Sequence, residues 1–289
     1  MSRYLIGITV FALVALAGST SYEDSVKAWQ QHRDSGLRSP TGWLTLVGLF
    51  WLNPGDNTIG SAPSNSFALP KGSAPEHVGT LHLEGENITF KPADGSATRQ
   101  LSYDEEKPDV LEAGSVKFYV IKRGTKFAVR AKDSASPALK HFTGMSYFPV
   151  NSALHVQAKL VPDVKKIPIL NILGETDLEE SPGVVEFTYK GAHYHLRPIY
   201  EDTPKGKTLF FLFKDTTNKK LTYQAGRMLN TPLPMNGTVD LDFNHSYNPP
   251  CTFTPFATCP LPPRENYLPF AVDAGEKRYS SGHAELPPS

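Results

Sequence analysis

Apolar and polar residues alternate along most of this chain, which is the pattern of β-strands with one buried face. In "TLHLEGENITF", apolar side chains occupy every second position on both sides of a turn. Three further stretches of this kind predict hairpins that turn at Arg123-Gly124, Lys190-Gly191 and Thr217-Asn218. Roughly a dozen short strands at this spacing predict a mainly β protein, a single barrel- or sandwich-like domain of antiparallel meanders.

One helix is predicted ahead of the strands. Ser21 with Asp24 three residues later resembles a capping box, and Gly36 is a suitable helix end. The apolar residues between them fall on one stripe, at Tyr22, Val26 and Trp29. The next run, "GWLTLVGLFWL", is apolar on every side and is core whether it forms a strand or a buried helix. Its tryptophans, Trp43 and Trp51, belong to that core or to the wall of a ligand pocket.

The N-terminus has the pattern of an export signal. Arg3 supplies a positive start, Tyr4 to Ala17 is apolar, and Ala15-Leu16-Ala17 is a small-x-small cleavage site. We therefore expect a signal peptide of residues 1–17, followed by one β-rich domain of residues 18–289 in the periplasm or outside the cell. No stable membrane insertion is expected after the signal is removed. An uncleaved anchor or a buried helix is the alternative interpretation of this run.

Charge and cysteine content narrow the partners. The chain has 29 Lys and Arg residues against 29 Asp and Glu residues, so its zero net charge disfavours nucleic acid as a partner. In an exported chain, two cysteines predict one disulfide, here between Cys251 and Cys259. A metal pair with His245, or two free thiols, are the alternatives. No motif for a cofactor is present, and no metal is predicted because His193 and His195 share a strand face without a third ligand.

Several segments of the chain resemble a known family. "GWLTLVGLFWLNPGDNTIGS", "YFPV", "FKDTTNKKLTYQAGRML" and "LDFNHSYNPPCTFTPFATCPLPPRENYLPFAVDAGEK" are similar to successive blocks of a mostly bacterial family known as domain of unknown function 1684. The resemblance extends from Trp29 to Lys277. It implies a single domain and leaves the activity open.

The last of these segments contains the candidate site. Residues 244–264 form a proline-rich loop without a strand or helix pattern, and ordered loops of this length are usually functional. Prolines restrict the unfolded chain and so favour order. The candidate ligand-binding residues in and around this loop are Arg227, Asp242, Asn244, Tyr247, Asn248, Glu265 and Asn266.

The leading hypothesis is that a small polar or amphipathic molecule binds in a pocket formed by this loop, the strand face of Asp242, and Trp43 or Trp51. Arg227 would be a clamp for a carboxylate of that molecule. A hydrolase using Asp242 and Glu265 as an acid/base pair is the alternative, and it requires carboxyl oxygens within about 10 Å of each other. A structural or interaction protein of the cell envelope is a second alternative. The third alternative is that Asp242, Asn244 and Asn266 only satisfy backbone groups of the loop, as Asp and Asn side chains often do in proteins.

Overall fold

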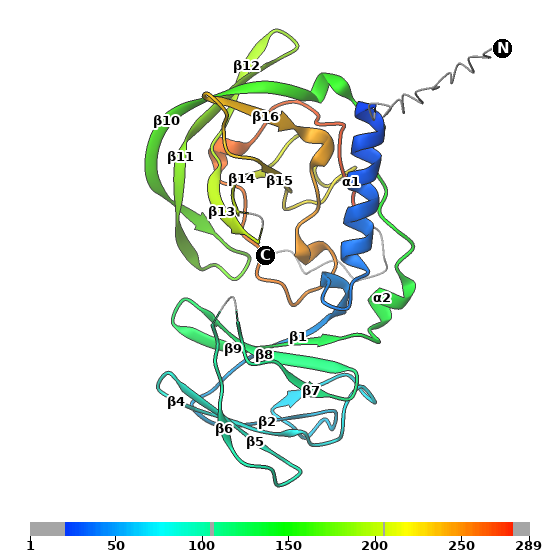
Figure 1. The fold of residues 1–289 in the computed structure, drawn as a ribbon, viewed down its shortest axis with the longest axis vertical. Coiled ribbons are helices and arrows are strands. Elements are labelled where there is room, and N and C mark those ends of the chain that lie inside the picture. The colour runs from blue at the N-terminus through cyan, green and yellow to red at the C-terminus, as the bar shows by residue number, and fades with distance from the viewer. Residues whose placement is uncertain (1–20, 105–106, 205, 280–289) are drawn as a thin grey trace, which may run out of the picture.

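The chain forms two β-rich units that lie one above the other along the long axis of the molecule (Figure 1). The structure, a computed structural model, describes residues 21–104, 107–204 and 206–279, and the predicted signal peptide lies outside them. We call the strands β1 to β9 the first unit and the strands β10 to β16 the second unit. Nearly all pairings are antiparallel, which confirms a mainly β, sandwich-like fold. No closed barrel occurs among the described strands.

The predicted helix, α1, spans Tyr22–Leu37. Ser21 is its N-cap, and the Oγ atom of Ser21 accepts a hydrogen bond from the Asp24 backbone N–H at 3.2 Å, which confirms the predicted start. The helix ends one residue beyond Gly36, where the Arg38 N–H bonds to the carbonyls of the last turn. Although α1 comes first in the chain, it packs along the side of the second unit (Figure 1).

In the first unit, two sheets enclose one core. A 3₁₀ turn, η1 (Trp43–Thr45), leads into β1 (Leu46–Trp51), so the apolar run is a strand that begins after one helical turn. Buried side chains such as Ile59, Phe118 and Val129 fill the space between the sheets. One sheet has the order β1, β9 (Lys126–Asp133), β8 (Val116–Arg123), β7 (Leu111–Ala113). The other has the order β3 (Phe67–Ala68), β2 (Gly55–Gly60), β4 (Gly79–Glu84), β5 (Asn87–Pro92), β6 (Arg99–Gln100).

The second unit also has two sheets, and apolar clusters cover both faces of the smaller one. Phe211 and Phe213 on β14 face one cluster, whereas Phe210 and Leu212 face another. The smaller sheet has the order β13 (Ile199–Thr203), β14 (Gly206–Phe213), β15 (Arg227–Thr231). The larger sheet has the order β12 (Ala192–Leu196), β11 (Thr176–Tyr189), β10 (His155–Leu170), β16 (Thr238–Asp242).

A long hairpin of β10 and β11 curves around this small sheet. β10 runs through Pro162 and Pro168 without a break, so the boundary between the two units does not lie there. The register shifts between Pro162 and Lys165, which marks a bulge that bends the strand. Opposite the bulge, Gly183 has φ +151°, and a Cβ there would lie 2.2 Å from the Val161 carbonyl oxygen. Only glycine permits this close approach of the two strands.

The two units are joined instead around residues 134–154 and by the proline-rich loop. The joining segment includes a short helix, α2 (Pro137–His141), and a 3₁₀ turn, η2 (Ser152–Leu154). Phe253 from the loop packs in a buried cluster with Leu37, Leu44 and Phe142. Thr254 donates a hydrogen bond from its Oγ1 to the Leu46 carbonyl at 3.0 Å. The loop therefore connects the second unit to β1 of the first unit.

Three 3₁₀ turns give the proline-rich loop its local structure: η3 (Phe243–His245), η4 (Pro250–Thr252) and η5 (Arg264–Asn266). The predicted disulfide is wrong for this structure, because Cys251 and Cys259 are buried free cysteines. The Cys251 backbone N–H donates to the Cys259 Sγ at 3.1 Å, and both side chains pack with Ala257. Packing and hydrogen bonds, rather than a covalent link, thus order the loop.

Candidate ligand-binding cavity

A cavity of about 500 Å³ lies between the two units. Volumes of this size are typical of small-molecule sites. The first unit contributes Arg123 and Arg130, and Trp43 of η1 adds an aromatic wall. The second unit contributes Phe210 and Met228, whose side chains belong to one of its apolar clusters. Further lining comes from Arg33 of α1, Glu201 of β13, and Tyr247, Asn248 and Cys259 of the loop region.

Arg130 reaches the cavity because β9 has two buried faces. Val129 and Ala131 point into the core of the first unit, so Arg130, between them, points to the opposite face. Only 8% of Arg130 is exposed, and its Nε atom is buried without a hydrogen-bond partner. No residue that the structure describes accepts a hydrogen bond from Arg130 or pairs with its charge. A buried charge without a partner is unfavourable. An acceptor from outside the protein would therefore stabilise Arg130.

The other two arginines of the cavity have protein partners. The Arg33 Nε lies 2.8 Å from Oε1 of Glu276, a carboxylate that is fully buried, and the Arg33 Nη2 donates to the Asn248 carbonyl at 3.1 Å. Arg123 donates from its Nη1 to the Lys122 carbonyl at 2.7 Å. These contacts hold Arg33 and Arg123 in the wall and distinguish them from Arg130.

Asn248, which also lines the cavity, has an acceptor without a partner. Its Nδ2 donates to Oε2 of Glu276 at 2.9 Å and to the Lys277 carbonyl at 2.8 Å, which fixes the orientation of the amide. Its backbone N–H also donates to Glu276, at 2.6 Å. The Oδ1 atom of Asn248 is left buried and has no partner among the described residues. The cavity therefore combines an unpartnered donor, Arg130, with an unpartnered acceptor, Asn248.

A hydrogen-bonded chain forms the polar part of the opposite wall. The Tyr247 hydroxyl donates to Oδ1 of Asn230 at 2.5 Å, and Asn230 Nδ2 donates to Oε2 of Glu201. Burial raises the pKa of Glu201, and the bond from Asn230 opposes that rise. Burial also raises the pKa of the Tyr247 hydroxyl, which keeps it a hydrogen-bond donor. The Arg33 guanidinium lies 4.8 Å from the centre of the Tyr247 ring.

Of the residues proposed from the sequence, Tyr247, Asn248 and Trp43 line the cavity, whereas Trp51 does not. Arg227, the proposed carboxylate clamp, is 1% exposed and lies outside the lining. It pairs with Asp215 at 2.8 Å and donates to the carbonyls of Val272 and Ala274. Arg227, which lies on β15, therefore holds the segment around Val272 and Ala274 against the smaller sheet.

The remaining polar candidates serve the folded chain. Asp242 accepts hydrogen bonds from the Tyr22 hydroxyl and from the Asn244 backbone N–H. Asn244 Nδ2 donates to the Asn151 carbonyl, and its Oδ1 accepts from the Asn151 N–H, both across 2.9 Å or less. Asn266 likewise accepts a hydrogen bond from the Arg197 N–H and donates to the carbonyls of Arg197 and Leu212. These contacts match the interpretation that such side chains satisfy backbone groups.

Glu265 lies in a different network from Asp242. Its Oε2 is 3.2 Å from the Nε of Arg197, and the same arginine pairs with Asp163 at 2.7 Å. Asp242 and Glu265 share no hydrogen-bond or ion-pair partner among the described residues. The two carboxyl groups therefore belong to separate contact networks.

Arg33, Arg123, Arg130 and Glu201 were missed from the sequence. The signal for Arg130 was its place within the apolar strand "FAVRA", where a charged residue interrupts a stretch that is buried on both faces. No local pattern marks the other three, because the docking of the two units brings them to the cavity.

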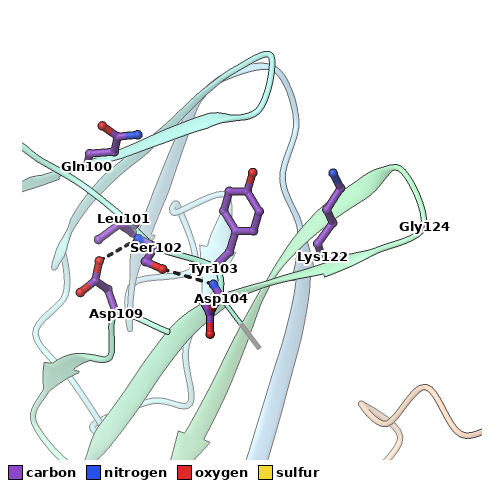
Figure 2. A pocket seen from close by; sticks show the side chains of 8 residues that line it. All are labelled: Gln100, Leu101, Ser102, Tyr103, Asp104, Asp109, Lys122 and Gly124. Carbon is purple, nitrogen blue, oxygen red and sulfur yellow. Dashed lines mark hydrogen bonds between the residues drawn. The ribbon is translucent and has the colours of Figure 1, made fainter. Parts of the chain in front are cut away.

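A larger depression of about 900 Å³ lies on the first unit and is open to solvent (Figure 2). Its polar groups are bonded to one another: the Ser102 N–H donates to Asp109, and the Asp104 N–H donates to the Ser102 Oγ (Figure 2). It contains no buried side-chain atom without a partner among its described residues. The depression therefore has no counterpart to Arg130, whose unpartnered Nε indicates a ligand in the cavity between the units.

No group of three or more His, Cys, Asp or Glu side chains is placed to hold a metal ion in residues 21–104, 107–204 and 206–279. Within the same part of the chain, no helix has the length and apolar character needed to cross a membrane.

Comparison with known proteins finds one family model and a similar solved structure, and neither is described with an activity. The model of the family described as "Protein of unknown function (DUF1684)" matches residues 140–277, which confirms the resemblance over the second unit and its loop. A similar solved structure is the solution NMR structure of the uncharacterized protein from gene locus rrnAC0354 of Haloarcula marismortui, with 26% sequence identity and a TM-score of 0.37. The match covers 48% of this chain and 78% of that chain. No curated protein matches the chain.

Proposed function

We propose from the geometry of this chain that it binds a small amphipathic molecule in the cavity between its two units. The description of the family whose model matches residues 140–277 names no activity. The proposal refines the expected pocket. The loop and Trp43 remain part of it, whereas Arg227 and Asp242 do not.

The observation that carries this proposal is Arg130, which is only 8% exposed and whose buried Nε has no partner among the described residues. A protein rarely buries a charge that nothing neutralises, unless the charge has a function. A ligand that supplies an acceptor to Arg130 removes this unfavourable term on binding. The contact with Arg130 therefore contributes to the affinity for the ligand, because Arg130 has no protein acceptor in the absence of the ligand.

The rest of the wall supports an amphipathic ligand rather than a wholly polar one. Phe210 and Met228 present apolar surface from the second unit, and Trp43 presents an indole from the other side. The Trp43 ring lies 5.6 Å from the guanidinium carbon of Arg130, so the apolar and charged parts of the wall are adjacent. An apolar group and a polar group on one small molecule fit this arrangement.

Export is part of the same proposal. The apolar run and small-x-small site of residues 1–17 support a signal peptide, and such a protein would meet its ligand in the periplasm or outside the cell. Intact-mass analysis of protein exported by its own host tests the cleavage after Ala17. Retention of Met1 in the exported protein would contradict it.

The binding proposal is tested by native mass spectrometry of the full chain and of a variant with an obstructed cavity. Thr258 lines the cavity and Thr176 is exposed at the start of β11, so Thr258→Trp is the obstruction and Thr176→Trp is its control. We expect protein from its own host to carry a bound mass that is kept by the control and lost by Thr258→Trp. A bound mass kept equally by Thr258→Trp, or no bound mass together with no thermal stabilisation by any compound of a metabolite panel, would refute the proposal.

A further inference from the structure

Resting on this proposed function, we infer the chemical class of the ligand: a small organic acid with one carboxylate, a neutral O–H or N–H donor, and an apolar part. The inference follows from the atoms that the cavity leaves without partners. These are the Nε of Arg130 and the Oδ1 of Asn248.

The charge of the ligand follows from Arg130. A guanidinium stays protonated at all physiological pH values, so only an anion can neutralise it. Glu276 already pairs with Arg33, and Glu201 places a second acidic group in the wall. Arg130 is the arginine of this wall without a hydrogen-bond or ion-pair partner among the described residues, so one positive charge remains for a ligand. A monoanion matches that balance, whereas a phosphate monoester, with about −1.5 to −2 charges, exceeds it and would meet Glu201 as well.

The shape of the anion follows from the free edge of the guanidinium. No N–H group of Arg130 donates to a described residue, and a guanidinium can form two parallel hydrogen bonds with a planar carboxylate. Lysine offers a point charge in place of this fork, so a lysine at this position would recognise a carboxylate less well. Arg130 therefore favours a planar carboxylate bound through two hydrogen bonds.

The donor of the ligand follows from Asn248. Its amide nitrogen is committed to Glu276 and Lys277, so Oδ1 is the atom that remains for a ligand. An oxygen acceptor requires an O–H or N–H group opposite it. A neutral donor suits the site, because a cationic amine would add a charge to a wall that already has three arginines. Hydroxy acids and N-acylated amino acids both have this chemistry.

Four matched compounds separate these requirements, measured as thermal stabilisation and by titration calorimetry at constant ionic strength. Phenyllactate carries the carboxylate, the hydroxyl and an apolar ring. Phenylpropionate lacks the hydroxyl, phenyllactamide lacks the charge, and phenyl phosphate replaces the carboxylate. N-acetylphenylalanine then distinguishes an N–H donor from an O–H donor. We expect phenyllactate or N-acetylphenylalanine to bind most tightly, and phenyllactamide to bind about 10- to 100-fold more weakly than phenyllactate.

Arg130→Met tests the residue, with Arg99→Met as its control on the exposed strand β6. Methionine fills similar space without the charge, so we expect Arg130→Met to fold with at least the thermal stability of the wild type. It should lose about 10- to 100-fold in affinity for the carboxylates, while its affinity for phenyllactamide is unchanged. Arg130→Lys should recover only part of the affinity, because it restores the charge and not the fork. Arg99→Met should bind like the wild type.

The outcomes separate the class of ligand from the act of binding. If phenyl phosphate binds more tightly than both carboxylates, or if phenyllactamide binds as well as phenyllactate and Arg130→Met binds the acids normally, the carboxylate class is wrong while binding in the cavity stands. If no acid stabilises the wild type, the class is overturned. If, in addition, no bound mass is found, the proposed function fails with it.

Discussion

At the scale of single residues, the polar side chains of the loop region divide into those that complete the fold and those that face the cavity. Arg227 illustrates the first kind, because its guanidinium is enclosed by Asp215 and by backbone carbonyls. Arg130 illustrates the second, because its guanidinium is nearly as buried and has no protein acceptor among the described residues. The presence of a partner, rather than the degree of burial, separates a structural arginine from a candidate binding residue.

Arg227→Met is expected to destabilise the protein strongly. The substitution leaves the Asp215 carboxylate buried without its partner, a situation that costs about 3 to 5 kcal/mol. Lys117→Met is the control, since Lys117 pairs with Glu112 on the surface and its loss should change the free energy of unfolding by less than about 1 kcal/mol. Denaturant unfolding measures both. A small effect of Arg227→Met would show that the C-terminal segment does not depend on this ion pair.

His245 predicts a loss of stability at mildly acid pH. Burial lowers the pKa of its imidazole below the ordinary value of 6.5, and the carboxylate of Asp242 offsets part of this effect. The unfolded chain therefore binds the proton more readily, so this contribution to stability is present above about pH 6.5 and is lost as the pH falls through the folded pKa. Neighbouring charges that enter this balance are His155 and Asp240.

Urea unfolding between pH 5 and pH 8 tests this expectation. His245→Gln should flatten the pH dependence of the unfolding free energy, while His193→Gln, at an exposed position of β12, should leave it as in the wild type. An equal slope in His245→Gln and wild type would assign the pH dependence to other groups.

At the scale of elements, local sequence patterns correctly predicted the features that depend on neighbouring residues, such as helix caps and tight turns. The capped start of α1 and the turn at Lys190-Gly191 both depend on adjacent residues, and both are present. β10 was not predicted because "VPDVKKIP" lacks alternation and contains prolines. It forms a strand nevertheless, because beyond Lys159 it no longer pairs with β16 and has a free edge, where prolines are tolerated.

The bend of the β10–β11 hairpin predicts a sensitive glycine. Gly183→Ala would place a methyl group 2.2 Å from the Val161 carbonyl oxygen in a backbone conformation unfavourable for alanine, so we expect a loss of about 2 to 4 kcal/mol. Gly36→Ala is the matched control, since it lies in α1 with nothing within 4 Å, and alanine should stabilise the helix by about 0.5 to 1 kcal/mol. Thermal unfolding of the two variants should move in opposite directions. A neutral Gly183→Ala would mean that the hairpin straightens at little cost.

At the scale of the whole molecule, the cavity exists only where the two units meet. Tyr247 and Asn248 were predictable as candidates because they lie in an unusual loop, whereas Arg33, Arg130 and Glu201 join them from distant positions in the sequence. The segment that matches the family, residues 140–277, therefore contains one wall of the cavity and lacks the other. It also lacks α1.

This dependence predicts that residues 140–279 do not form a stable fold by themselves. Without α1, the buried Glu276 carboxylate loses Arg33, and Asp242 loses the Tyr22 hydroxyl. We expect this fragment to lack a cooperative unfolding transition, and we expect a peptide of residues 21–39 to restore part of it. A peptide with Arg33→Met is the control and should be less effective. A cooperative transition in the fragment alone would show that α1 is an accessory to the second unit.

The position of α1 has a consequence for how the protein matures. A helix of 16 residues is marginal in water by itself. The polar partners of its residues Tyr22 and Arg33 lie 220 and 243 positions later in the chain, so they are synthesised long after the helix. Such long separations slow folding. During translation, α1 is therefore made long before the residues that it contacts. It can reach its folded position only after the second unit has been synthesised.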